Sequence, residues 1–308
     1  MSVSTINTIH IDGPDTIVGL SELRLAYMSP TCITIGSSTR KAIEASQQVV
    51  EQVVRDERVI YGINTGFGQL AQTVVPAERL LDLQKNLVRS HSAGVGEPLD
   101  DAVVRLTLLL KVASLARGRS GVRSVIVDTL SRFLEREIYP VIPSKGSVGA
   151  SGDLAPLAHL AGVLIGEGQV RIQGEVVSAS EGLRVAELAP LELGPKEGLA
   201  LLNGTQVSTA LALGGLFETE DLLLAAVVAG AMAVEASKSS HTPFDERIHT
   251  ARGQRGQAIV AAAFRRFLTG TGINGSQINS GRVQDPYSVR CQPQVLGACL
   301  DLIRSSAE

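Results

Sequence analysis

One stretch of the sequence limits the possible folds more than any other. Residues 198–238 have a helical pattern that is interrupted only at Asn203-Gly204, and within them residues 222–234 form an apolar run. The run is shorter than the ~20 residues that a membrane-spanning helix needs. A helix that is apolar all round has to be buried by neighbours on every side. The run therefore predicts a buried core helix in a bundle of helices.

Other apolar stripes at helical spacing extend this prediction to most of the chain. One β signal stands out, because residues 170–177 alternate around Gln173-Gly174, as in a small hairpin. The predicted fold is mainly α, with an N-terminal α-rich globular domain, the start of a long helical bundle and one small β-hairpin. We place the boundary near Arg117-Gly118, which gives domains of residues 1–117 and 118–308.

Composition excludes several classes of protein. The net charge is −3, aromatic residues make up 3% of the chain and tryptophan is absent, so a nucleic-acid partner is not expected. The three cysteines are too few and too scattered for a disulfide framework or a structural zinc site. No cluster has the spacing of a metal site, and the N-terminus lacks a secretory signal. We expect a cytoplasmic protein without a metal ion or a membrane partner.

The segment with the most chemical information is the loop KGSVGASGD at residues 145–153. Its glycines follow the spacing GxxGxxG, which is neither the dinucleotide pattern nor the P-loop pattern. Asp153 is expected to be the N-cap of a helix that starts at Leu154. Ser151 and Gly152 would then lie at the positive end of the helix dipole. From spacing alone, a plain glycine-rich entry to a helix remains the alternative.

The longer stretch GSVGASGDLAPLAHLAG resembles the signature of the histidine and aromatic amino-acid ammonia-lyases. Four further blocks resemble the same family in the same order along the chain. They are YGINTGFG (61–68), LVRSHSAGVG (87–96), EGLALLNGTQ (197–206) and VQDPYSVRCQPQ (283–294). The resemblance covers the chain from about residue 15 to its end.

The resemblance implies an electrophile made from the chain itself. In the family an Ala-Ser-Gly triplet cyclises and dehydrates to 4-methylidene-imidazol-5-one (MIO), and here the triplet is Ala150-Ser151-Gly152. The nitrogen of Gly152 would attack the carbonyl of Ala150, and glycine permits that tight fold at low steric cost. Ser151 would lose its hydroxyl as water and leave a methylene. No external cofactor is then expected.

The same resemblance assigns roles to residues outside the triplet. Tyr61 would take a proton from the β-carbon of the substrate, although a core tyrosine is the plain alternative. Asn203 would hydrogen-bond the electrophile or the substrate amine, and otherwise it is a turn asparagine. Tyr287 and Arg290 lie three residues apart and face one way on a helical turn. Arg290 would bind the substrate carboxylate rather than form a surface salt bridge. Tyr287 and Gln284 complete the site.

The pair Ser90-His91 indicates the substrate. The histidine branch of the family carries a similar pair, whereas the phenylalanine branch tends to have Phe-Leu and the tyrosine branch His-Leu. His91 would bind the imidazole of L-histidine, and the products would be urocanate and ammonia. A core histidine at this position, another aromatic substrate, an aminomutase and a non-catalytic helical fragment remain alternatives. His159, His241 and His249 also match the family and are expected to be structural.

The resemblance covers only the N-terminal part of the family's sequences. Full-length relatives continue with a second half of bundle helices that carries a glutamate near the imidazole and a phenylalanine against the ring. Family active sites are assembled from several subunits of a homotetramer. We expect a chain cut at Glu308 to expose apolar surface, to self-associate or rearrange its last helices, and to have little lyase activity with histidine. The triplet would stay uncyclised if the packing around it were lost.

Overall fold

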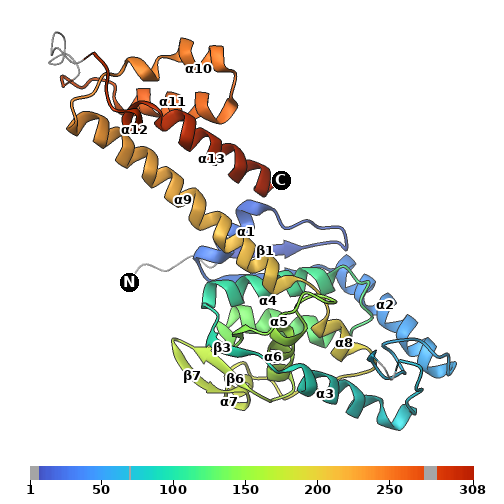
Figure 1. The fold of residues 1–308 in the computed structure, drawn as a ribbon. Coiled ribbons are helices and arrows are strands. Elements are labelled where there is room, and N and C mark those ends of the chain that lie inside the picture. The colour runs from blue at the N-terminus through green and yellow to red at the C-terminus, as the bar shows by residue number, and fades with distance from the viewer. Residues whose placement is uncertain (1–6, 69–70, 274–282) are drawn as a thin grey trace. The chain divides into compact units, whose positions relative to one another are not determined.

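The computed structural model describes residues 7–68, 71–273 and 283–308, and Figure 1 shows the path of the chain. The chain divides into two compact units, Met1–Gly214 and Gly215–Glu308, which are described separately. Helix α9 (Gln206–Ala236) begins in the first unit and ends in the second.

Helices make up most of the first unit. They are α1 (Leu20–Met28), α2 (Ser37–Arg55), the 3-10 turn η2 (Ala77–Arg79), α3 (Leu80–His91), α4 (Asp101–Ala116), α5 (Ser124–Glu135), α6 (Leu154–Leu164), α7 (Ala179–Val185) and α8 (Glu197–Leu202). Helix α4 is central, since it packs against α1, α2 and α5 and is buried on nearly all sides. Helices α3, α6 and α8 pack against one another. This packing fixes the start of α6, which follows the triplet, and the end of α8, which precedes Asn203.

Small sheets lie among these helices. Strand β1 (Asn7–Ile11) pairs in parallel with β2 (Thr31–Ile35), and β3 (Val95–Pro98) pairs antiparallel with β5 (Pro143–Lys145). Strands β6 (Gln169–Ile172) and β7 (Glu175–Ser178) form the predicted hairpin, which β4 (Ile138–Pro140) extends to three strands. Gln173 and Gly174 have φ values of 51° and 87°, as a tight two-residue turn requires.

The second unit consists of the end of α9 and the short elements that follow it. These are η3 (Thr242–Phe244), α10 (Glu246–Arg252), α11 (Arg255–Phe267), α12 (Tyr287–Arg290) and α13 (Gln292–Ala307). The rings of Phe244 and Phe264 stack in its core with centroids 4.9 Å apart. Helices α11 and α13 cross closely, because a Cβ on Gly256 would lie 2.1 Å from the carbonyl oxygen of Gly297. Only glycine fits there.

The structure confirms the mainly α fold, the hairpin and the helix break at Asn203-Gly204. It also contains the β1–β2 and β3–β5 pairs, which the sequence analysis did not predict. The prediction of a buried helix over residues 222–234 is wrong for this chain. Leu222, Leu224 and Met232 are 69%, 66% and 68% exposed, because the second unit supplies neighbours for one face only.

The boundary proposed near residue 117 remains a prediction. The division into two compact units falls between Gly214 and Gly215, and α4 and α5, which flank the proposed boundary, pack together inside the first unit. Across the described ranges we find no helix with both the length and the apolar character needed to cross a membrane.

Candidate active site

The Ala150-Ser151-Gly152 triplet forms an exposed turn between β5 and α6. Ser151 has a φ of 62° and Gly152 a φ of 94°, so two consecutive residues adopt the left-handed region that favours glycine. The amide of Gly152 donates a long hydrogen bond of 3.3 Å to the carbonyl of Gly149. The serine of the triplet is thus held in a backbone conformation that is unusual for a residue with a side chain.

The turn is pressed against the segment between α8 and α9. Gly152 forms a parallel bridge with Gly204, and the amide of Asp153 donates to the carbonyl of Gly204 at 2.8 Å. A Cβ on Gly152 would lie 2.1 Å from that carbonyl oxygen. A side chain at this position would therefore push the two segments apart. The structure thus brings Gly204, the residue after Asn203, directly against the triplet.

Asp153 joins two helices in a way that the sequence did not predict. It stands at the N-cap position of α6, but its side chain makes no capping hydrogen bond there. The carboxylate instead accepts from the amide of Ser208 at 2.7 Å and from the hydroxyls of Ser147 and Ser208. Ser208 is the third residue of α9, whose first amides lack partners within the helix. The predicted cap is corrected: this buried carboxylate caps α9 and fixes it to the triplet loop.

A buried lysine holds the other side of Asn203. Lys111 on α4 is 1% exposed, and its Nζ donates to the carbonyl oxygen of Asn203 at 2.8 Å. Burial lowers the pKa of Lys111 to about 7, because a charged ammonium loses its hydration there. The side-chain amide of Asn203 donates to the carbonyl of Leu199 at 2.9 Å, which leaves its Oδ1 as an acceptor.

The loop that carries Tyr61 packs on the same helix, α8. Gly62 has a φ of 82°, and a Cβ on it would meet the side chain of Leu199 at 2.4 Å. The side chain of Asn64 closes the loop, since it accepts from the amide of Ile60 and donates to the carbonyl of Arg58. The ring of Tyr61 is 56% exposed. The loop is therefore fixed to α8 while its tyrosine projects outward.

Buried side chains anchor α8 itself. The Oε1 of Gln84 on α3 accepts from the amide of Gly198 at 3.0 Å. Glu197 is 1% exposed and binds the guanidinium of Arg123 at 2.7 Å and the amide of Gly194 at 2.6 Å. The position of Asn203, one residue beyond α8, is therefore set by contacts to α3 and to the start of α5.

His91 ends α3 and keeps one ring nitrogen free among the described residues. Its Nδ1 lies 2.9 Å from the carbonyl oxygen of Leu87, so Nδ1 carries the hydrogen in that bond and Nε2 is an acceptor. His159, in contrast, accepts the amide of Gly94 at 3.0 Å, and burial lowers its pKa. His159 thus has the structural place expected for it, and His91 has the free nitrogen that a ligand role requires.

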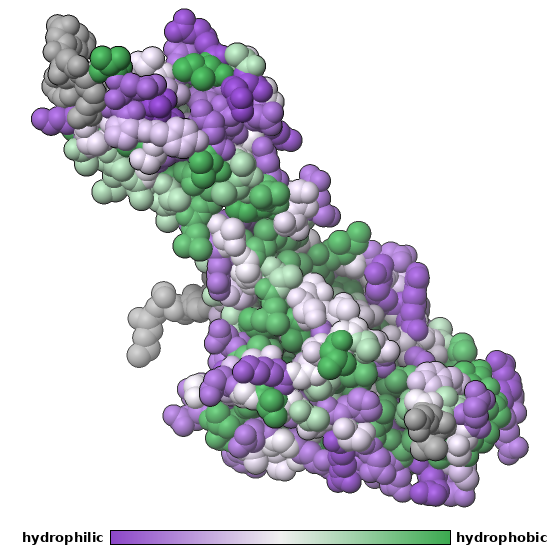
Figure 2. Space-filling view, viewed as in Figure 1, coloured by the Kyte–Doolittle hydropathy of each residue, from purple (hydrophilic) through white to green (hydrophobic). Residues whose placement is uncertain are grey.

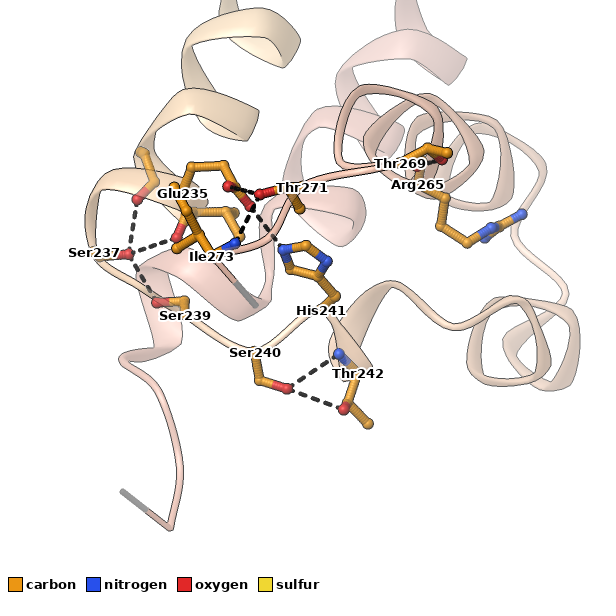
Figure 3. A network of polar contacts seen from close by, with 12 residues as sticks. Glu235, Ser237, Ser239, Ser240, His241, Thr242, Arg265, Thr269, Thr271 and Ile273 are labelled. Atoms are coloured by element: carbon orange, nitrogen blue, oxygen red, sulfur yellow. Dashed lines mark hydrogen bonds and ion pairs between the residues drawn. The ribbon is translucent and has the colours of Figure 1, made fainter. Parts of the chain in front are cut away.

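The remaining predicted residues belong to the second unit, where a polar network holds their segment. Glu235 at the end of α9 binds the ring of His241 at 2.8 Å and the hydroxyl of Thr271 at 2.5 Å, as Figure 3 shows. One residue before His241, the amide of Ser240 donates to the buried carboxylate of Asp285 at 2.7 Å. The turn that precedes α12 is thus fixed to the end of α9.

Gln284, Tyr287 and Arg290 lie at this turn. Gln284 is exposed, and Tyr287 is 70% exposed with its pKa raised, chiefly by a hydrogen bond with Cys291. Arg290 donates from Nε to the carbonyl of Asp285 at 2.8 Å. Tyr287 and Arg290 share the single turn α12, as predicted. His249, treated as structural, binds the carbonyl of Pro243 and the amide of Gln257.

The triplet fits the internal electrophile that the sequence suggested. Cyclisation joins the nitrogen of the third residue to the carbonyl carbon of the first, so the backbone has to fold back at the middle residue. The positive φ values of Ser151 and Gly152 give that fold, and the contact with Gly204 leaves no room for a larger third residue. Among the described residues no group of three or more His, Cys, Asp or Glu side chains could hold a metal ion.

Comparison with known proteins agrees with this geometry. The profile described as aromatic amino acid lyase matches residues 20–308. The chain belongs to the aromatic amino acid lyase family. It is 54% identical over 309 residues to the histidine ammonia-lyase of Pseudomonas fluorescens (strain SBW25) and 55% identical over 290 residues to that of Paracidovorax citrulli (strain AAC00-1). The alignments cover 100% and 94% of this chain, and 59% and 57% of those proteins.

Solved structures of the aromatic amino acid lyase family share the fold. The phenylalanine aminomutase of Pantoea agglomerans superimposes with a TM-score of 0.89 at 32% identity, over 97% of this chain and 61% of that one. The histidine ammonia-lyase of Trypanosoma cruzi gives a TM-score of 0.84 at 34% identity, over 96% and 55% of the two chains. This chain therefore spans between half and two thirds of the length of these family members.

Sequence reasoning missed Lys111 and the partner of Asp153, both of which hold the segments around the triplet. Lys111 had a signal, because it is a single charge inside the apolar stretch 108–115 of a helix predicted to be buried. Asp153 was noticed, but its partner Ser208 is 55 residues away, and no local pattern predicts that contact.

Proposed function

We propose that this chain carries the electrophile-bearing part of an ammonia-lyase that converts L-histidine to urocanate and ammonia. The observation that carries the proposal is the turn at Ser151, with Gly152 pressed on Gly204 and Asn203 beside it. Membership of the aromatic amino acid lyase family, and the histidine ammonia-lyases among its close relatives, support the reaction and the substrate.

The proposed prosthetic group is MIO, made from Ala150, Ser151 and Gly152 with loss of two waters. When formed, it would supply an electrophilic methylene, the chemistry that makes the substrate amine a better leaving group. Asn203 orients that amine through its side-chain Oδ1. Tyr61, on its exposed loop, removes the proton from the β-carbon. The proton would pass to the phenolic oxygen of Tyr61, the electron pair of the broken C–H bond would form the double bond between the α- and β-carbons, and the bond from the α-carbon to nitrogen would break so that the nitrogen is finally released as ammonia. No external cofactor is needed.

His91 gives the preference for histidine in this proposal. Its free Nε2 would accept an N–H of the substrate imidazole, and a phenyl ring has no such donor. Arg290 would bind the substrate carboxylate, with Tyr287 and Gln284 adding hydrogen bonds. The Nε of Arg290 is held by Asp285, so its two terminal nitrogens remain available among the described residues.

We further propose a cytoplasmic homo-oligomer, a tetramer by analogy with the family. All three cysteines are free thiols, as in a reducing compartment. An apolar groove of about 740 Å³ in the second unit supports association. It is lined chiefly by side chains of α9, α11 and α13, among them Leu223, Leu224, Val228, Ile259, Phe267 and Leu300.

The reaction is tested in a chain extended by the part of the Pseudomonas fluorescens relative that this chain lacks. We expect L-histidine to yield urocanate and ammonia, and Ser151→Ala to abolish the reaction. Ser180→Ala, a change at an exposed serine of α7, is the matched control and should leave the rate unchanged. Activity that survives Ser151→Ala would reject the proposal. Formation of a β-amino acid would instead favour the aminomutase reaction of the structural neighbour.

A further inference from the structure

Lys111 is a buried cation that the proposed reaction does not use. It is the seventh buried side chain of α4, and its neighbours on that helix are aliphatic. Within the described ranges, no carboxylate lies at ion-pair distance from its Nζ. Its one hydrogen bond goes to the backbone carbonyl of Asn203 at 2.8 Å. An unpaired charge in the core is costly. A lysine at this position therefore has a role that leucine could not fill.

The hydrogen bond of Lys111 leads directly to the triplet. Asn203 stands at the end of α8, and the next residue, Gly204, has a φ of 135° that only glycine adopts readily. The carbonyl of Gly204 then accepts the amide of Asp153 at 2.8 Å and touches Gly152. Three consecutive contacts therefore connect the core helix α4 to the two residues that close the turn.

Without Lys111 the Asn203 carbonyl would have no partner in the core. An unsatisfied buried carbonyl tends to rotate toward another donor or toward water. Rotation of the Asn203–Gly204 peptide would change the φ of Gly204 and so move the Gly204 carbonyl, because the two groups are adjacent along the backbone. The contact that holds Gly152 and Asp153 would loosen, even though no residue of the triplet had changed.

We propose that Lys111 is a positioning residue for the Ala150-Ser151-Gly152 triplet. By fixing the Asn203 carbonyl, it fixes the Gly204 carbonyl against which the turn closes. As far as cyclisation is concerned this inference rests on the proposed function, but the placement of the turn does not. Two measurements separate the placement of the turn from cyclisation. Hydrogen exchange of the Asp153 amide reports the placement of the turn, and the loss of two waters reports cyclisation. Cyclisation consumes the amide of Gly152 and leaves that of Asp153 intact.

The test compares Lys111→Met with Lys196→Met. Lys196 is a matched control, because it is also partly buried, its pKa is also lowered by burial, and its Nζ also donates to a backbone carbonyl, that of Ser120. Hydrogen exchange of the Asp153 amide is measured in both variants and in the unchanged chain. We expect exchange to be at least about tenfold faster in Lys111→Met alone. The amide of Leu157 in α6 should be protected equally in all three.

Mass spectrometry gives the second readout. If the unchanged chain loses two waters, Lys111→Met should lose them more slowly after refolding, and Lys196→Met at the normal rate. Should Lys111→Met not fold, Lys111→Gln replaces it, since it keeps an N–H donor on a shorter side chain and should still speed the exchange of Asp153. Equal exchange of the Asp153 amide in the Lys111 and Lys196 variants would overturn the inference, whether or not any chain cyclises.

Discussion

The clearest contrast between the two units lies between buried charges in the first and exposed apolar helix faces in the second. In the first unit even charged groups are buried and bonded, as Lys111, Asp153 and Glu197 show with exposures of only 1% each. In the second unit large apolar side chains face solvent, and Phe267 and Leu302 are 56% and 70% exposed. Figure 2 shows hydrophobic surface along part of α9. The first unit holds these three buried charged groups with hydrogen bonds of its own, whereas the second leaves apolar surface for neighbours that it does not contain.

This difference divides the proposed site into two parts. The triplet, Asn203, Tyr61 and His91 rest on contacts inside the first unit. Gln284, Tyr287 and Arg290 rest on the second unit, which also carries the apolar groove. The geometry around the electrophile should therefore be nearly complete in this chain, while substrate binding should depend on further protein.

The largest effect is expected at the carboxylate that joins the triplet loop to α9. Asp153→Ala removes the acceptor of three hydrogen bonds and leaves the Ser208 amide unpaired. We expect the free energy of unfolding to fall by about 3 kcal/mol in urea titrations. Asp245→Ala, which removes the exposed cap of α10, is the comparison and should cost less. Equal losses in the free energy of unfolding for the two variants would show that the buried hydrogen bonds of Asp153 do not stabilise the first unit as we describe.

The apolar groove of the second unit predicts self-association of the chain. Leu224 lines the groove and is 66% exposed. Leu224→Glu should weaken association by about 2 kcal/mol or more, over tenfold in Kd. Val176→Glu, at an exposed position on β7 outside the groove, should leave it unchanged. Light scattering measures the mass in solution, and a monodisperse monomer of the unchanged chain would contradict the prediction.

His91 sharpens the substrate assignment. In the extended chain, His91→Leu removes the acceptor proposed for the imidazole N–H. The ratio of kcat/KM for histidine to kcat/KM for phenylalanine should fall roughly tenfold, which corresponds to about 1.5 kcal/mol of transition-state free energy. His159→Leu would disturb the fold, since that ring accepts a backbone amide, so His10→Leu at the exposed end of β1 is the better control. An unchanged ratio in His91→Leu would mean that another group selects the ring.

A further prediction concerns pH and Lys111. Burial lowers the pKa of this lysine in the folded chain to about 7, below its value in the unfolded chain. Between pH 7 and about pH 10 the unfolded chain therefore binds more protons, so stability rises with pH by up to about 1.4 kcal/mol per pH unit. Lys111→Met should lack this rise. Urea titrations of both chains from pH 7 to pH 9 measure the difference, and parallel curves would show that Lys111 is charged when folded.

Much of the fold could be predicted from local patterns, and the reasons are physical. The helix break at Asn203-Gly204 and the turn at Gln173-Gly174 depend on residues whose backbone preferences act locally. The exposure of Leu222 and Met232 agrees with the expected exposure of apolar surface, although periodicity could not show which face of the helix would lack neighbours.

The candidate site divides in the same way. Motif resemblance identified Ser151, Asn203 and Tyr61, and the structure places the first two on segments in direct contact. It could not identify the residues that hold them. The bonds from Lys111 to Asn203 and from Asp153 to Ser208 join positions 92 and 55 residues apart, and such contacts follow only from the packing of α4, α6 and α9.

The most direct test of the central claim is the intact mass of this chain without any extension. The claim is that the first unit alone folds Ala150-Ser151-Gly152 into the conformation from which the electrophile forms. The purified chain should therefore weigh less than its sequence by two waters, and Ser151→Ala should keep the mass of its own sequence apart from at most one water. A purified, folded chain with the full mass of its sequence would contradict the claim and show that the triplet needs the protein that this chain lacks.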